Sequence, residues 1–100
     1  MATNAIDVGD AVRLSVVYRN ASTQALLDPN NVILKVARPN GTSTTYTYSV
    51  DVALVKDSTG TYHLDYVPTI DGTHYYKWSG TGNMNAVEES SFAVKTSRVN

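Results

Sequence analysis

The stretch VRLSVVY, at residues 12–18, alternates apolar and polar side chains with a period of two. Val12, Leu14 and Val16 share one face of an extended chain, and the two residues between them are polar. This period is typical of a β-strand that buries one face and exposes the other. The stretch therefore predicts a strand of an antiparallel sheet with one buried face.

The same alternation returns along the chain, between residues that favour turns. Asn40-Gly41 after Pro39 is the clearest turn, because proline fixes φ and an Asn-Gly pair tolerates positive φ. The valine-rich stretch at residues 50–55 is the least regular and is expected at a sheet edge. The sequence predicts strands near residues 12–18, 32–36, 44–48, 50–55, 62–66, 72–78 and 87–94.

Seven short strands without helical periodicity indicate an all-β domain. Each strand has one apolar face to cover, so two sheets are expected to pack face to face. The predicted fold class is an immunoglobulin-like, two-sheet antiparallel β-sandwich of about seven strands, with a small β-barrel as the alternative. Residues 1–100 are expected to form a single domain, with short tails at about 1–6 and 96–100 that are mobile because they can bury little.

The composition excludes several classes of protein. The chain of 100 residues has no cysteine, which excludes disulfides, thiolate metal sites and cysteine nucleophiles. Its net charge of −1 lacks the basic excess that nucleic-acid binders need, so no nucleic-acid partner is expected. No apolar run is long enough to cross a membrane, and the first residues lack the features of a signal peptide. We therefore expect neither a membrane partner nor export.

The two histidines are the first candidates for catalytic chemistry. His63 and Asp65 share the polar face of one predicted strand and are expected to form a solvated pair, with a catalytic His–Asp dyad as the alternative. No serine lies in a Gly-x-Ser-x-Gly motif, so nothing indicates a hydroxyl for such a dyad to activate. His74 falls among inward-facing aromatic residues and is expected in the core. We expect no enzyme activity and no catalytic residue.

The acidic residues are the candidates for a metal site. Four aspartates near predicted turns could bind calcium: Asp7, Asp10, Asp57 and Asp71. Each is explained without a metal, because an aspartate at a turn bonds its own backbone, and the chain has no Asp-x-Asp-x-Asp run. We therefore expect no metal ion and no cofactor. Glu88 and Glu89 are strand neighbours that face opposite sides, so they are expected to guard a sheet edge and not to act as an acid–base pair.

Aromatic residues are the remaining candidates for a binding surface. Alternation assigns four of them to the core: Tyr62, Tyr66, Tyr76 and Trp78. Three tyrosines that this rule does not assign define the candidate binding surface: Tyr46, Tyr48 and Tyr75. If these three rings were exposed together, they would form a patch suited to stacking on a sugar or docking a protein.

Short motifs follow one another in an order that carries a family resemblance. They are DVGD (7–10), DP (28–29), RPNGT (38–42), STGTYH (58–63), DGT (71–73), YKW (76–78), GTG (80–82) and EESSF (88–92). From about residue 6 to residue 97, the chain resembles the small immunoglobulin-like domain proteins encoded among the structural genes of tailed bacteriophages and prophages. It departs from that pattern at His74, where a residue such as tryptophan is expected, and in the loop at residues 20–27.

The resemblance implies a structural part in a virion and no reaction. It implies a non-enzymatic subunit that decorates or cements a capsid, or alternatively an accessory protein of the neck or tail. The expected partners are other virion proteins, including further copies of the chain, and the expected location is the virion, assembled in the bacterial host cytoplasm. A carbohydrate-binding or adhesion module, with a host glycan as its partner, is the other alternative.

Overall fold

β-strands and turns make up the described chain. A computed structural model describes residues 6–95. Its elements are β1 (Ile6–Asp7), β2 (Val12–Val17), β3 (Asn31–Ala37), β4 (Ser43–Thr47), β5 (Leu54–Ser58), β6 (Thr61–Tyr66), β7 (Gly72–Thr81) and β8 (Ala86–Lys95). Ile6, expected in a tail, begins β1, and the other tail residues, 1–5 and 96–100, lie outside the described residues. Within residues 6–95, no helix could cross a membrane.

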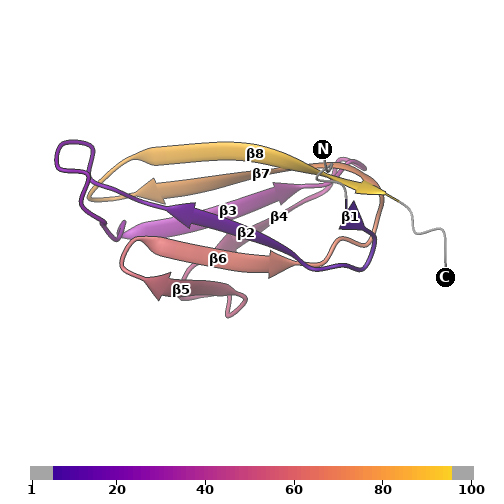
Figure 1. Ribbon diagram of the computed structural model, residues 1–100, viewed down its shortest axis with the longest axis horizontal. Helices are drawn as coiled ribbons and strands as arrows, with labels where there is room; N and C mark the ends of the chain where they lie inside the picture. Colours follow the sequence, from indigo (N-terminus) through magenta and orange to yellow (C-terminus); the bar gives the residue numbers. More distant parts are fainter. Residues whose placement is uncertain (1–5, 96–100) are drawn as a thin grey trace.

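The strands form two separate sheets that pack face to face (Figure 1). The larger sheet has the order β1-β8-β7-β3-β4, and the smaller sheet has the order β2-β6-β5. All neighbours are antiparallel except β1, which runs parallel to β8. The prediction of an all-β sandwich is confirmed, with eight strands in place of about seven. The order matches the immunoglobulin fold, in which strands B, E and D share one sheet and C, F and G the other.

The fourth predicted strand begins later than the sequence indicates. The stretch at residues 50–55 predicts a strand, but β5 includes only its last two residues. Thr47 donates its N–H to the Asp51 carboxylate (2.8 Å), and its carbonyl accepts a bond from the Asp51 N–H (2.9 Å). These bonds close a turn after β4, so Val50 (74% exposed) and Val52 (97% exposed) meet solvent. The predicted edge position of this strand is confirmed.

The core lies between the sheets and is built from their alternating inner residues. Leu34, Val36 and Trp78 of the larger sheet are fully buried. Tyr66 of the smaller sheet reaches across, with its ring centroid 6.0 Å from that of His74. The core residues are Leu14, Val16, Tyr18, Val32, Leu34, Val36, Leu54, Tyr62, Leu64, Tyr66, Trp78, Phe92 and Val94. The aromatic residues predicted for the core are confirmed there, except that one of them, Tyr76, is only half-buried.

A tight turn at Thr59-Gly60 joins β5 to β6. Gly60 has a φ of +73°, a left-handed conformation that glycine adopts without strain. Its carbonyl accepts a bond from the Tyr18 N–H (2.7 Å), and a Cβ added to it would lie 2.6 Å from the Tyr18 carbonyl oxygen. The turn therefore holds the end of β2 in place and has no room for a side chain.

The substitution Gly60→Ala is expected to destabilise the fold by about 2–4 kcal/mol, from left-handed strain plus a backbone clash. Gly41→Ala is the matched control, because Gly41 also has a positive φ (+92°) but no atom within 4 Å of an added Cβ. The control should lose only about 1 kcal/mol through strain. Urea unfolding of both variants measures the two losses, and equal losses would contradict the close packing at this turn.

Candidate binding surfaces

The three candidate tyrosines do not form one surface. Tyr46 pairs with Leu34 of β3, whose side chain is buried, so Tyr46 faces the smaller sheet. Tyr75 pairs with Ala37, which lies three residues after Leu34 and therefore on the opposite face of the larger sheet. The predicted patch of Tyr46, Tyr48 and Tyr75 is thus divided between two faces.

Tyr46 and Tyr48 lie at the side of the sandwich formed by β4. Tyr48 follows β4, and its ring meets that of Tyr62 edge-on, with centroids 5.2 Å apart. Tyr46 is half-buried, and desolvation raises the pKa of its hydroxyl. Tyr46 therefore packs against the core between the sheets, whereas Tyr48 touches Tyr62 but remains exposed (36%).

Tyr75 is the most exposed tyrosine of the three and borders an open hollow of about 470 Å³ on the outer face of the larger sheet. Its side chain is 61% exposed. The hollow extends over β3, β7 and β8, and its charged lining residues are Lys35, Lys77 and Glu89. Because tyrosine combines a large ring with a polar tip, this position suits contact with a protein or a sugar.

The charged residues of the hollow stand in one row across three strands. Lys35 of β3 lies directly opposite Lys77 of β7, which in turn lies opposite Glu89 of β8. Two neighbouring ammonium groups repel each other, and neither lysine forms an ion pair with another described residue. The two lysines can therefore attract an acidic group of a ligand or partner. The sequence does not indicate this row, because only the strand register aligns three residues from distant segments.

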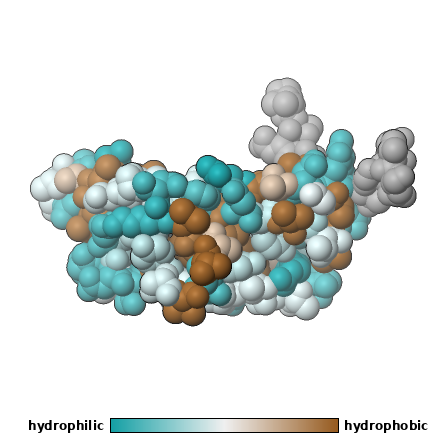
Figure 2. All heavy atoms as spheres, turned by 90° about the horizontal axis from the view of Figure 1, so that it is seen from below, coloured by the Kyte–Doolittle hydropathy of each residue, from teal (hydrophilic) through white to brown (hydrophobic). Residues whose placement is uncertain are grey.

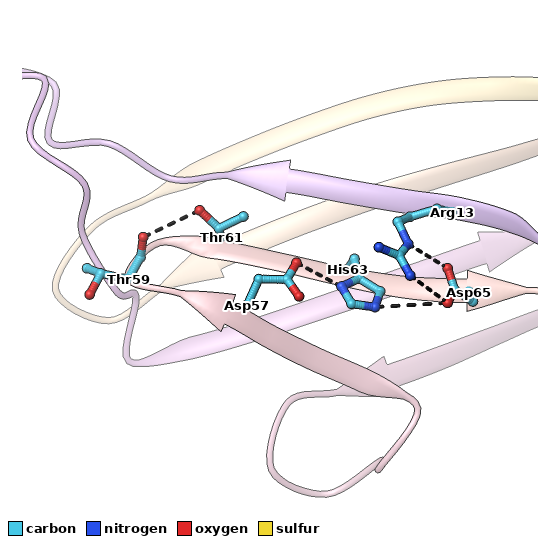
Figure 3. A network of polar contacts seen from close by, with 6 residues as sticks. All are labelled: Arg13, Asp57, Thr59, Thr61, His63 and Asp65. Atoms are coloured by element: carbon cyan, nitrogen blue, oxygen red, sulfur yellow. Dashed lines mark hydrogen bonds and ion pairs between the residues drawn. The ribbon is translucent and has the colours of Figure 1, made fainter.

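The His63 side chain belongs to a polar network on the outer face of the smaller sheet (Figure 3). Its Nδ1 lies 2.8 Å from Asp57 Oδ2, and its Nε2 lies 4.0 Å from Asp65 Oδ2. His63 is only 9% exposed, so the prediction that His63 and Asp65 form a solvated pair is wrong about the burial of His63. The nearer partner of His63 is Asp57. The reason is a β-bulge between Lys56 and Ser58, which places Asp57 beside His63 as an extra residue of the edge strand.

Asp65 is bound by an arginine of the neighbouring strand. Arg13 lies opposite Asp65, and its Nε and Nη2 donate to the two carboxylate oxygens at 2.8 and 3.0 Å. These bonds lower the pKa of Asp65. Thr61 donates its hydroxyl to the Thr59 carbonyl (3.5 Å), and no hydroxyl of the described chain bonds to His63. The network links three strands, and among residues 6–95 His63 contacts two carboxylates and no hydroxyl that a dyad could activate.

His74 lies in the core, as the sequence predicts. Its side chain is fully buried, and its ring stacks on that of Phe92 with centroids 5.0 Å and planes 15° apart. Its Nδ1 lies 3.3 Å from the Gly72 carbonyl oxygen. The contribution of His74 is therefore packing against its aromatic neighbours.

Two of the aspartates considered for calcium have other partners. Asp7 lies 3.8 Å from the Lys95 ammonium, and Asp57 bonds to His63. Among residues 6–95, no three His, Asp or Glu side chains are placed to hold a metal ion.

The Asp28 carboxylate joins segments that are distant in the sequence. It accepts hydrogen bonds from Lys56 Nζ (2.7 Å), the Gly60 N–H (2.7 Å) and the Tyr62 hydroxyl (3.2 Å). The bond from Lys56, and then that from Gly60, lowers the pKa of Asp28. The partners lie 28 to 34 residues further along the chain, so no local pattern indicates them.

Exposed apolar residues gather at the edge of the sandwich formed by β5. The turn before β5 exposes Val50 and Val52, and β5 itself exposes Val55. Figure 2 shows apolar side chains near the middle of the lower face, among hydrophilic ones. This apolar patch is a second surface on which a partner protein could pack.

No protein-family model and no curated protein matches the sequence. The exposed surfaces on which a partner could bind are the hollow beside Tyr75 and the apolar patch at Val50, Val52 and Val55.

The substitution Asp28→Asn is expected to lower the free energy of unfolding at neutral pH, because it removes the charge that pairs with Lys56. Folding lowers the pKa of Asp28 below its ordinary value of 3.8, so the carboxylate stabilises the fold above that pH. This contribution is lost as the pH falls through the folded-state pKa. The urea midpoints of the wild-type and variant proteins should therefore differ at about pH 6 and converge as the pH falls well below 3.8.

Asp10→Asn is the control for the change in net charge, because the Asp10 carboxylate is exposed and forms no ion pair with a described residue. It should leave the midpoint at about pH 6 close to that of the wild type. A gap between Asp28→Asn and the wild type that stays constant with pH would contradict the ionic contact.

Proposed function

We propose that the protein is a non-enzymatic structural subunit of a bacteriophage particle, which decorates or cements the capsid. The observation that carries the proposal is the exposed outer face of the larger sheet, where Tyr75 and the Lys35–Lys77 pair border a hollow. The ordered motifs that resemble immunoglobulin-like virion proteins support the same assignment. Its partners are then other virion proteins, and its location is the virion.

A subunit of this kind needs a rigid domain that folds stably on its own. The core of this sandwich is continuous between the sheets, and the chain, which has no cysteine, holds it together without a disulfide. The His63 network lies on the smaller sheet and links its strands, whereas the hollow lies on the larger sheet. These features favour binding over catalysis.

The outer face of the larger sheet suits a modest contact with another protein. Tyrosine is enriched among the residues that dominate binding energy, since it buries a large ring at a small entropic cost. The neighbouring lysines add attraction for an acidic surface and so contribute to specificity. Where subunits are linked on a particle lattice, they attach at many equivalent points. Contacts that are individually weak then give a high overall avidity.

Two alternatives use the same face. A neck or tail accessory protein would differ from a capsid subunit only in its partner. A carbohydrate-binding or adhesion module is the second candidate function, and the exposed ring of Tyr75 beside the hollow is the observation that favours it.

The purified protein is expected to bind stoichiometrically to particles of the encoding phage that lack it. Tyr75→Ala and Lys77→Glu should each weaken this binding at least about tenfold, because each removes a contact of the hollow. Val67→Ala truncates an exposed side chain outside both candidate surfaces and should bind as the wild type does. Co-sedimentation with capsids, necks and tails measures the binding, and a protein that ignores all three would refute the proposal.

A glycan array tests the second candidate. Adhesion predicts binding to at least one host-surface glycan and its loss in Tyr75→Ala, because the stacking ring is removed. Val67→Ala should leave the glycan signal unchanged. An array on which the wild-type protein binds nothing would reject adhesion and leave the virion assignment to the particle experiment.

A further inference from the structure

One edge of β8 has almost no partner in the described chain. β8 pairs with β7 from Ala86 to Val94, but on its other side only Val94 and Lys95 pair, with β1. The remaining stretch, residues 86–93, is about 27 Å long. We name this stretch the β8 edge, and it lies along the upper border of the molecule in Figure 1.

Hydrogen bonds identify the backbone groups that point outward from the β8 edge. The Lys95 carbonyl accepts a bond from the Val8 N–H (3.1 Å), so it points toward β1 and away from β7. Every second residue of an antiparallel strand shares this direction. Val87, Glu89 and Ser91 have the same orientation, and no described residue pairs with them on that side.

The edges formed by β4 and β5 are closed in ways that the β8 edge is not. On β4, the turn bonds of Asp51 cap Thr47, so only Ser43 and Thr45 keep outward backbone groups. On β5, a β-bulge at residues 56–58 interrupts the strand. Short edges and bulges are means by which proteins prevent pairing with another chain. The β8 edge is longer and regular.

The side of the sandwich bordered by β8 and β2 has an open position for a strand. Constant-type immunoglobulin domains carry their first strand beside the second, on this side of the fold. Here β1 supplies only Ile6–Asp7, and β2 has no strand beyond it in the described chain. Figure 1 shows β8 and β2 as border strands on the same side. Glu88 and Ser90, on the inner face of β8, are exposed there.

Charge indicates what kind of strand fits. Glu88 and Glu89 lie opposite Trp78 and Lys77, so they face opposite sides as predicted, and neither forms an ion pair with a described residue. Two copies that paired antiparallel about the centre of the β8 edge would place two Glu89 carboxylates side by side, which is unfavourable. A strand with lysine or arginine at these positions would bring opposite charges together.

We propose that the β8 edge binds an extended, basic segment of another protein, which joins the larger sheet as a further strand. Main-chain hydrogen bonds to Val87, Glu89 and Ser91 hold the segment, and its basic side chains meet Glu89 on the outer face of the sheet or Glu88 on the inner face. The β8 edge adjoins the hollow, because Glu89 and Ser91 also line it, but strand pairing at this edge does not depend on the particle to which the protein belongs.

The test uses the whole protein and two capped eight-residue peptides, one alternating valine with lysine and the other alternating valine with glutamate. The lysine peptide should shift the ¹⁵N-detected amide signals of Val87, Glu89 and Ser91 and slow their hydrogen exchange. The glutamate peptide should bind at least about tenfold more weakly, because it places like charges together.

Two variants separate the backbone from the charge contribution. Ser91→Pro removes an outward N–H without removing a bond to β7, so it should weaken binding of the lysine peptide at least about tenfold. Ser43→Pro makes the same change at an outward position of β4 and should bind as the wild type does. Glu89→Lys should shift the preference toward the glutamate peptide, and it tests the proposal even if Ser91→Pro does not fold.

Four results would overturn the proposal. Equal binding of both peptides would show that charge does not select the segment. Unshifted amide signals along the β8 edge would show that the peptide binds to another part of the protein. Slow amide exchange at Val87, Glu89 and Ser91 in the monomer alone would mean that another part of the same chain covers the β8 edge. Deletion of residues 1–5 would test this, because faster exchange in the shortened chain would identify those residues as the cover. Dimerisation that Ser91→Pro abolishes would make a second copy the occupant.

Discussion

The contact between the two sheets is the interaction on which the rest of this protein depends. Leu34 and Trp78 of the larger sheet are fully buried, and Tyr66 of the smaller sheet meets Phe92 of the larger one with ring centroids 6.1 Å apart. Because the chain has no disulfide, this packing holds the sheets together and decides which side chains face outward. The hollow, the His63 network and the β8 edge all consist of groups that the packing leaves outside.

Alternation is a local property, so the sequence was sufficient to predict most strands and most of the core. The failures arise where a contact with another residue overrides the local pattern. Valines at residues 50–53 favour a strand, but the bonds between Thr47 and Asp51 close a turn there. His63 was correctly placed on the outer face, but the bulge that brings Asp57 beside it depends on pairing with a neighbouring strand.

The candidate site was harder to predict, because it depends on the register between strands. The sequence shows which residues of one strand share a face, but it does not show how that strand aligns with the next. Tyr46 and Tyr75 are therefore both reasonable surface candidates, and only the pairing of each with β3 separates them. The row of Lys35, Lys77 and Glu89 is likewise visible only when three strands are placed side by side.

The pairing of β1 with β8 sets Ile6 directly beside Val94, so the polypeptide enters and leaves the sandwich at neighbouring points. A domain whose ends are adjacent can be inserted into a surface loop of another protein without separating the two ends of that loop. The inserted domain then projects from the side of that protein. In a chain of such domains joined end to end, each domain would return the polypeptide close to the point where it entered. Each domain would therefore add little to the end-to-end length of the chain.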